Sequence, residues 1–230
     1  MQKTVSFLEL IGGGRIPEVL VGTWIVMALL LVFGYLARAT LAAAADPTIP
    51  DESITLRSVA EVMVEWVDGF VAGVMDSHHY RELVPFLGSL FVFILASNFF
   101  GLIPGIEPPT SFSDLTFALG TICFFYFVYQ GFRRNGISYL RSFLGPLLVL
   151  SPIMLPIEVA DNLFRPFSLG LRLAANMFAD HQVLHLFTGL TYLIVPLAFY
   201  ALASIVCVIQ ALIFMVLTMS YVKLAQSHEH

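Results

Sequence analysis

The chain has 230 residues, of which 58% are hydrophobic and 12% are charged, and its net charge is −5. A mean hydropathy of +0.87 together with 21 phenylalanines excludes a soluble domain and is typical of a polytopic membrane protein. The acidic balance argues against nucleic acid as a partner, because phosphate binding needs clustered Lys and Arg. Cys123 and Cys207 lie singly within apolar runs and are interpreted as small core residues.

The first apolar segment covers residues 19–37 and is long enough to cross about 30 Å of hydrocarbon as a helix. Small residues at 42–45 resemble a signal cleavage site, but Glu9 and Glu18 come before the segment and no strong basic cluster does. We therefore expect a retained transmembrane helix. Residues 54–75 follow with an amphipathic pattern that predicts a helix along the membrane surface. Its polar face is acidic, whereas helices that lie on lipid typically carry a basic polar face. The helix is therefore expected to pack either on protein or on lipid.

Two spanning helices are predicted at residues 83–106 and 115–132. The loop between them carries no basic residue, whereas the loop after them carries Arg133, Arg134 and Arg141. By the positive-inside rule the second loop is cytoplasmic. This places the N-terminus outside and the C-terminus inside.

Two long elements complete the predicted fold: a broken or tilted helix over residues 142–188, and a tilted helix over residues 190–223. At about 1.5 Å per residue, both exceed a hydrocarbon layer of about 30 Å, so strong tilt is expected. Gly189 marks the turn of the hairpin, and reflection about it puts Arg172 one turn from Gln210. The predicted fold class is an all-α polytopic membrane protein with a single membrane domain.

A line of polar residues follows one face of the first long helix. At about 100° per residue the following side chains share an arc of about 120°: Glu158, Asp161, Arg165, Ser168, Arg172, Asn176 and Asp180. Asp161 and Arg165 can form a structural ion pair at i,i+4. Arg172 has no acid one turn away, and a guanidinium at mid-bilayer costs about 2.5 to 3.5 kcal/mol. Its counter-ion must be distant in sequence, on another chain, or on a passing substrate.

His181 and His185 also stand at i,i+4. This spacing suits two zinc ligands on one helix, but neither a third ligand nor an intervening glutamate is evident. The two histidines are interpreted as lining a hydrated path that passes protons, or as packed helix residues. No phosphate loop, dinucleotide fingerprint or nucleophile elbow is present, so neither a metal nor a cofactor is predicted.

Residues 168–179 read SLGLRLAANMFA. This stretch resembles the signature of subunit a of the F-type ATP synthase membrane sector, and it is the most specific of three similar parts of the chain. Residues 210–218, QALIFMVLT, are similar to the final helix of that family, and residues 98–104 with 108–111 are similar to its outer loop. Together they cover most of the chain after Leu83.

The resemblance implies a non-catalytic stator in a bacterial inner membrane, lying against a rotating ring of c subunits. The b subunits of the peripheral stalk and the rest of the synthase are its further implied partners. Arg172 matches the family's essential arginine, which faces each ring carboxylate in turn. The other matching polar positions are Asn176 and Gln210 beside the arginine, Glu158 and Arg165 on the cytoplasmic side, and His181 on the path from outside.

Two positions depart from the family's pattern. Gly101 stands where some members carry an acid, and Ala203 stands where some carry a histidine or glutamate. We therefore expect Asp180 or His185 to take over in the outer route.

The expected mechanism uses two offset half-channels that do not meet. An ion from outside neutralises a ring carboxylate, the ring turns through lipid, and the ion leaves on the other side, so that ion flow is coupled to ATP synthesis. The alternative is a self-contained ion-coupled transporter, which would need paired repeats and a midplane pocket; no repeat is visible. An intramembrane hydrolase lacks a recognisable nucleophile or metal triad. The sequence leaves H⁺ and Na⁺ open, because the selecting ligands belong chiefly to the ring.

Overall fold

The computed structural model describes residues 17–43, 55–75, 80–103, 105–136, 151–190 and 194–226. Every regular element in these ranges is helical, which confirms the predicted all-helical class for the described chain. In order the elements are α2 (Glu18–Ala43), α3 (Leu56–Val74), η1 (Tyr80–Glu82), α4 (Val84–Phe100), η2 (Pro109–Ser111), α5 (Ser113–Asn135), α7 (Ser151–Leu190) and α8 (Ile194–Gln226).

Three of the described helices, α2, α5 and α8, are long and apolar enough to cross a membrane. Helix α4 is also apolar but has only 17 residues, about 25 Å of helix. Helix α7 has 40 residues, about 60 Å, which is about twice the thickness of the hydrocarbon layer. It is not among the apolar spans, because its polar stripe lowers its hydropathy.

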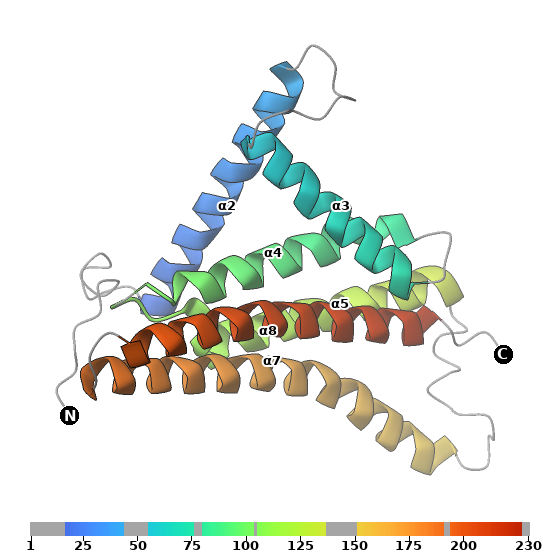
Figure 1. Cartoon of the computed structure of the whole chain (residues 1–230). Helices are drawn as coiled ribbons and strands as arrows, with labels where there is room; N and C mark the ends of the chain where they lie inside the picture. Colours follow the sequence, from blue (N-terminus) through green and yellow to red (C-terminus); the bar gives the residue numbers. More distant parts are fainter. Residues whose placement is uncertain are drawn as a thin grey trace.

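Helices α4, α5, α7 and α8 run side by side, and α2 and α3 form two sides of a triangle whose base is α4 (Figure 1). Helices α7 and α8 are antiparallel neighbours. The buried core lies where α3, α4, α5, α7 and α8 meet and includes Val71, Leu87, Ile94, Phe127 and Met215. Many large apolar side chains on α2, α5 and α8 point outward instead, the pattern expected of surfaces covered by lipid or by other membrane helices.

Helix α7 is bent rather than broken over the described residues 151–190 (Figure 1). Pro156 and Pro166 lie in the half that curves away from α8, and an internal proline bends a helix because it removes one backbone hydrogen bond. The helix continues through Gly189, so the connection to α8 falls at residues 191–193, outside the described residues. Residues 142–150 of the predicted element also lie outside them.

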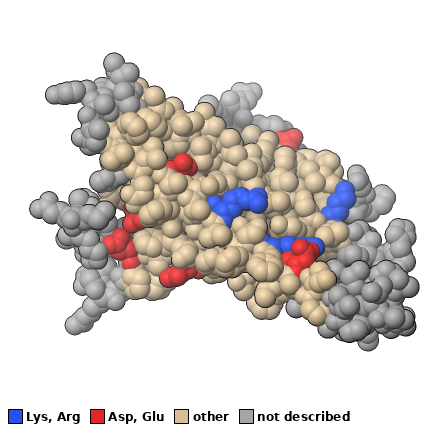
Figure 2. Space-filling view, turned by 90° about the horizontal axis from the view of Figure 1, so that it is seen from below, with Lys and Arg blue, Asp and Glu red and all other residues tan. Residues whose placement is uncertain are grey.

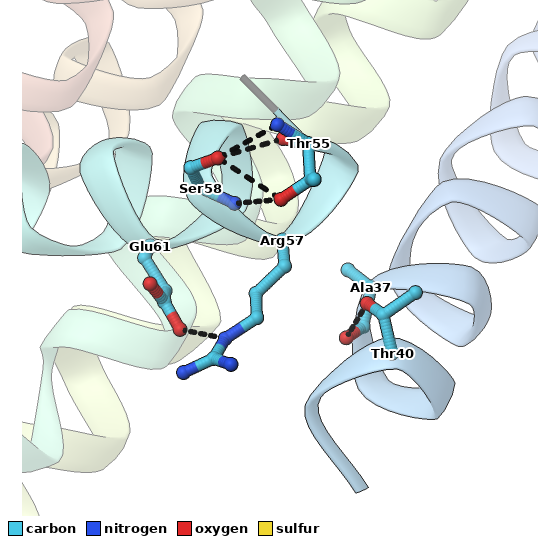
Figure 3. Close-up of polar contacts among 6 residues, drawn as sticks. All are labelled: Ala37, Thr40, Thr55, Arg57, Ser58 and Glu61. Carbon is cyan, nitrogen blue, oxygen red and sulfur yellow. Dashed lines mark hydrogen bonds and ion pairs between the residues drawn. The ribbon is translucent and has the colours of Figure 1, made fainter. Parts of the chain in front are cut away.

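Helix α3 is capped at its start and bonded to α8 at its other end. Thr55 and Ser58 form a capping box, in which each side-chain oxygen accepts a hydrogen bond from the other residue's backbone N–H (Figure 3). Arg57 is only 4% exposed, and its Nε donates to Glu61 at 2.6 Å. At the other end Lys223 Nζ donates to the carbonyl of Val74 at 3.1 Å.

Replacing Thr55 by alanine should loosen the start of α3. The change removes the side-chain acceptor of the capping box, which is worth about 1 kcal/mol. We expect faster hydrogen exchange at the amides of the first turn of α3 and unchanged exchange toward Val74. Thr40→Ala is the matched control, because Thr40 Oγ1 is exposed and bonds the carbonyl of Ala37 within its own helix (Figure 3). Equal exchange at the α3 amides in both variants would contradict a role for the cap.

The end of the bundle opposite the α7–α8 connection gathers basic residues. Arg133 Nη1 bonds Glu82 at 2.7 Å, and Asn135 Nδ2 donates to the carbonyl of Ala225 at 3.1 Å. These contacts tie the end of α5 to η1 and to the end of α8, which carries Lys223 in its last turn.

Candidate functional site

Arg172 lies near the middle of α7 with its side chain exposed. Among the described side chains, its guanidinium makes no hydrogen bond or ion pair. Figure 2 shows the side of the molecule on which α7 lies, where a few basic and acidic groups stand on a largely uncharged surface and one basic group touches an acidic one. The described part of the chain therefore supplies no counter-ion to Arg172.

Several small or short polar residues lie on the same face of α7 as Arg172. Ser168, Ala175, Asn176 and Ala179 are all exposed on this face, with the larger exposed side chain of Leu171 beside them. Because small residues let helix backbones approach closely, this face has room for another helix beside the guanidinium.

At this level α7 meets Gln210 of α8. Gln210 is 4% exposed, and its Nε2 donates to the backbone carbonyl of Arg172 at 3.4 Å. The contact puts Arg172 and Gln210 at the same level of the two antiparallel helices. Gln210 therefore bonds the backbone of Arg172 and not its guanidinium.

Toward the basic end of the bundle, Arg165 is neutralised within the chain. Its Nη2 donates to Asp161 Oδ2 at 2.5 Å, which confirms the predicted ion pair, and its guanidinium lies 5.6 Å from the centre of the Tyr221 ring. The side chain of Glu158 lies outside the described residues.

Toward the other end, a small cavity lies between α4, α7 and α8. Its volume is about 20 Å³, enough for one water molecule, which needs at least about 10 to 15 Å³. The lining residues are Asn98, Gly101, Leu102, Pro108, Met177, Asp180, His181, Leu184, Ala203 and Cys207. Oδ2 of Asp180 is buried and has no hydrogen-bond partner in the described structure. The side chain of His185 lies outside the described residues.

The cavity also brings together the two positions that depart from the family pattern. Gly101 and Ala203 both line it, together with Asp180 and His181. Four positions, from α7, from α8 and from the residue that follows α4, thus line one small cavity. Of these four, Asp180 and His181 carry ionisable groups.

Sequence reasoning did not single out Asn98, which anchors this region. Asn98 is 1% exposed. Its Nδ2 donates to the carbonyl of Cys207 at 3.2 Å, and its Oδ1 accepts a hydrogen bond from Thr110 Oγ1 at 2.7 Å. A polar residue within an apolar helix is the signal that could have found it. The carbonyl of Cys207 and the hydroxyl of Thr110 become partners only in the folded chain.

Gly101 is glycine for a steric reason. Its backbone has φ −72° and ψ −10°, which any residue can adopt. A Cβ atom at this position, however, would stand 2.2 Å from the Cβ of Pro108. Pro108 occupies the space into which a side chain at position 101 would project, so no acid fits there with this loop in place.

The remaining candidates are structural. In the described ranges no group of three His, Cys, Asp or Glu side chains could hold a metal ion. Cys123 and Cys207 are buried free thiols, as predicted for core residues.

Fold and site together define an all-helical integral membrane protein in which an exposed arginine on one helix of a pair has no ion-pair partner among the described residues. A family model described as ATP synthase A chain matches residues 20–223. ATP synthase subunit a of Bdellovibrio bacteriovorus is 39% identical over 198 residues, covering 86% of each chain. ATP synthase subunit a 3 of Pelobacter propionicus is 38% identical over 208 residues, covering 90% of this chain and 87% of that one.

The chain therefore belongs to the ATP synthase A chain family, a non-catalytic component of the membrane sector.

Proposed function

We propose that the chain passes protons between the two sides of the membrane and a ring of c subunits, and thereby couples ion flow to ATP synthesis. The observation that carries this proposal is the exposed guanidinium of Arg172, which the described chain does not neutralise. Because arginine cannot discharge itself, it needs a carboxylate from another molecule. A carboxylate on a passing ring helix meets this need, and the small residues around Arg172 leave space for that helix.

Arg172 separates the two half-channels in this mechanism. Its permanent charge attracts an ionised ring carboxylate, favours release of that group's proton, and opposes cation leakage from one half-channel to the other. Asn176 lies one turn along the same face, and Gln210 holds the backbone from behind. The driving force is the membrane field, about 2.3 kcal/mol per charge per 100 mV, together with the pH gradient.

The outer half-channel runs through the cavity at Asp180 and His181. The buried, unpartnered carboxylate oxygen of Asp180 and the room for one water molecule support this route. A water molecule there would lie beside the ionisable side chains of Asp180 and His181 on α7. Asp180 takes the role of the acid that other family members carry at position 101, where this chain has no space for one. His185 is assigned to the outer half-channel because it lies one turn beyond His181 on α7.

The cytoplasmic half-channel uses the other end of the polar stripe. Asp161 is exposed, while its partner Arg165 is held between Asp161 and Tyr221. Glu158 and Ser168 complete this half on either side of the pair. The basic residues near the ends of α5 and α8 support a cytoplasmic location for this end of the bundle. The N-terminus is then outside and the C-terminus inside, in a bacterial inner membrane, with the b subunits of the peripheral stalk as further partners.

A self-contained transporter fits these observations less well. Such a protein would direct its central charge into an enclosed midplane pocket, whereas Arg172 is exposed on the surface of the described chain.

Side-specific labelling tests the two half-channels. In a chain lacking Cys123 and Cys207, single cysteines at positions 180 and 181 should react with a membrane-impermeant thiol reagent added outside. Cysteines at positions 158 and 161 should react only from the cytoplasmic face. Phe125→Cys is the control, because this apolar position on the spanning helix α5 should react from neither side. Reaction of both groups from the same side would replace the half-channels with a single pore, and exchanged sides would invert the topology.

A further inference from the structure

Helix α7 lies tightly against α5 at Gly170, two residues before Arg172. A Cβ atom at Gly170 would stand 2.9 Å from the backbone carbonyl oxygen of Thr116 and 3.1 Å from Cδ1 of Phe117. Ordinary contacts between such atoms lie at about 3.5 to 4.0 Å. Helix α7 therefore rests directly on the backbone of α5 and can do so only because position 170 lacks a side chain.

The part of α5 that α7 contacts here is itself held in place. Thr116 is fully buried, and its Oγ1 donates to the carbonyl of Ser113 at 3.0 Å. The rings of Phe117 and Phe167 stack beside this contact with their centroids 5.2 Å apart. Since the nearest atom to position 170 is a backbone oxygen in a buried helical turn, a change of side-chain rotamer could not make room.

Two backbone contacts thus hold α7 next to Arg172. On one side Gly170 meets the Thr116 carbonyl of α5, and on the other side the Arg172 carbonyl accepts the hydrogen bond from Gln210 of α8. The described structure gives the guanidinium itself no partner. The position of the Arg172 charge is therefore set by where its backbone is held.

We propose that Gly170 is a positioning residue, whose missing side chain lets α7 rest on α5 and so sets the distance between Arg172 and the carboxylate that it faces. This inference rests on the proposed role of Arg172. A Cβ at position 170 moves α7 away from α5, toward the partner helix. In sites that depend on geometry, a displacement of 1 Å can cost about 100-fold in rate.

Gly170→Ala in the complete synthase tests the proposal. We expect an assembled complex whose ATP-driven proton pumping falls by about tenfold or more, with Arg172 intact. Gly73→Ala is the matched control, because a Cβ there meets no atom within 4 Å, and alanine favours a helix. That variant should pump normally. Pumping at the wild-type rate by assembled Gly170→Ala would overturn the proposal.

Cross-linking gives a readout that a purely structural role would not change. A cysteine at the exposed position 171, in a chain lacking Cys123 and Cys207, is tested against single cysteines along the ring helix. Direct disulfides need Cα atoms within about 7 Å. We expect Gly170→Ala to shift the preferred ring partner or the spacer length needed, whereas an unchanged pattern would count against a displacement of α7.

A double variant covers the case in which Gly170→Ala assembles poorly. Phe117→Ala removes the 3.1 Å contact but leaves the Thr116 carbonyl in place, so Gly170→Ala with Phe117→Ala should assemble and still pump more slowly than Phe117→Ala alone. Equal rates, or loss of assembly in both variants that carry Gly170→Ala, would assign Gly170 to folding alone and overturn the proposal. Arg172→Ala is measured in parallel: normal pumping there rejects the role of Arg172 itself, whatever the result at Gly170.

Discussion

Arg172→Ala is expected to abolish ATP-driven proton pumping while the chain still assembles into its complex. The side chain is exposed and has no partner among the described residues, so truncating it removes no core packing. What it removes is the fixed charge that faces the ring and separates the half-channels.

Arg172→Lys is expected to fail as well. Lysine keeps a positive charge, but it loses the planar fork of the guanidinium and can release its proton when it is desolvated. Pumping is measured in vesicles reconstituted with purified complex, as acidification driven by ATP hydrolysis. Leu197→Ala serves as the control, since it truncates an exposed apolar side chain on α8. Full pumping by either Arg172 variant would reject the assignment.

Gly101→Ala should prevent correct packing of the outer loop. The added Cβ would lie 2.2, 2.6 and 2.8 Å from three ring carbons of Pro108, and a proline ring cannot turn aside because it is closed onto its own backbone. The loop must therefore move away from α4. We expect the bond between Thr110 and Asn98 to be lost, and little assembled complex to remain at growth temperature.

The defect should be repaired from the other side of the contact. Gly101→Ala combined with Pro108→Gly removes the colliding ring and should recover assembly in large part, measured as the amount of subunit in purified complex. Gly34→Ala is the matched control, because a Cβ there has open space. Normal assembly of Gly101→Ala alone would show that the loop does not pack as described.

The sequence predicted the helical elements and the polar stripe because both follow from local periodicity. Apolar runs and helical spacing depend on residues within a few positions of one another, so Asp161 with Arg165 could be paired in advance, and the structure confirms that pair. The same reasoning predicted that Arg172 has no acid one turn away. It placed the turn of the hairpin at Gly189, whereas α7 continues to Leu190, because a glycine permits a turn without requiring one.

The contacts around the cavity, and the bond to the backbone of Arg172, could not be predicted from the sequence. Asn98 meets a carbonyl 109 residues away, and Gln210 meets one 38 residues away. No periodicity encodes such pairs, because they depend on how helices distant in sequence pack together.

By itself, therefore, the sequence determined an all-helical membrane protein, the face on which its polar residues lie, and an arginine without a local counter-ion. Only the tertiary structure decided that Asp180, His181, Gly101 and Ala203 line the same small cavity. It alone revealed that Gly101 and Gly170 are sites of backbone contact. The physical reason is that the sequence shows only that a glycine has no side chain. The atoms that pack against the glycine come from another part of the chain, and only the folded structure shows which they are.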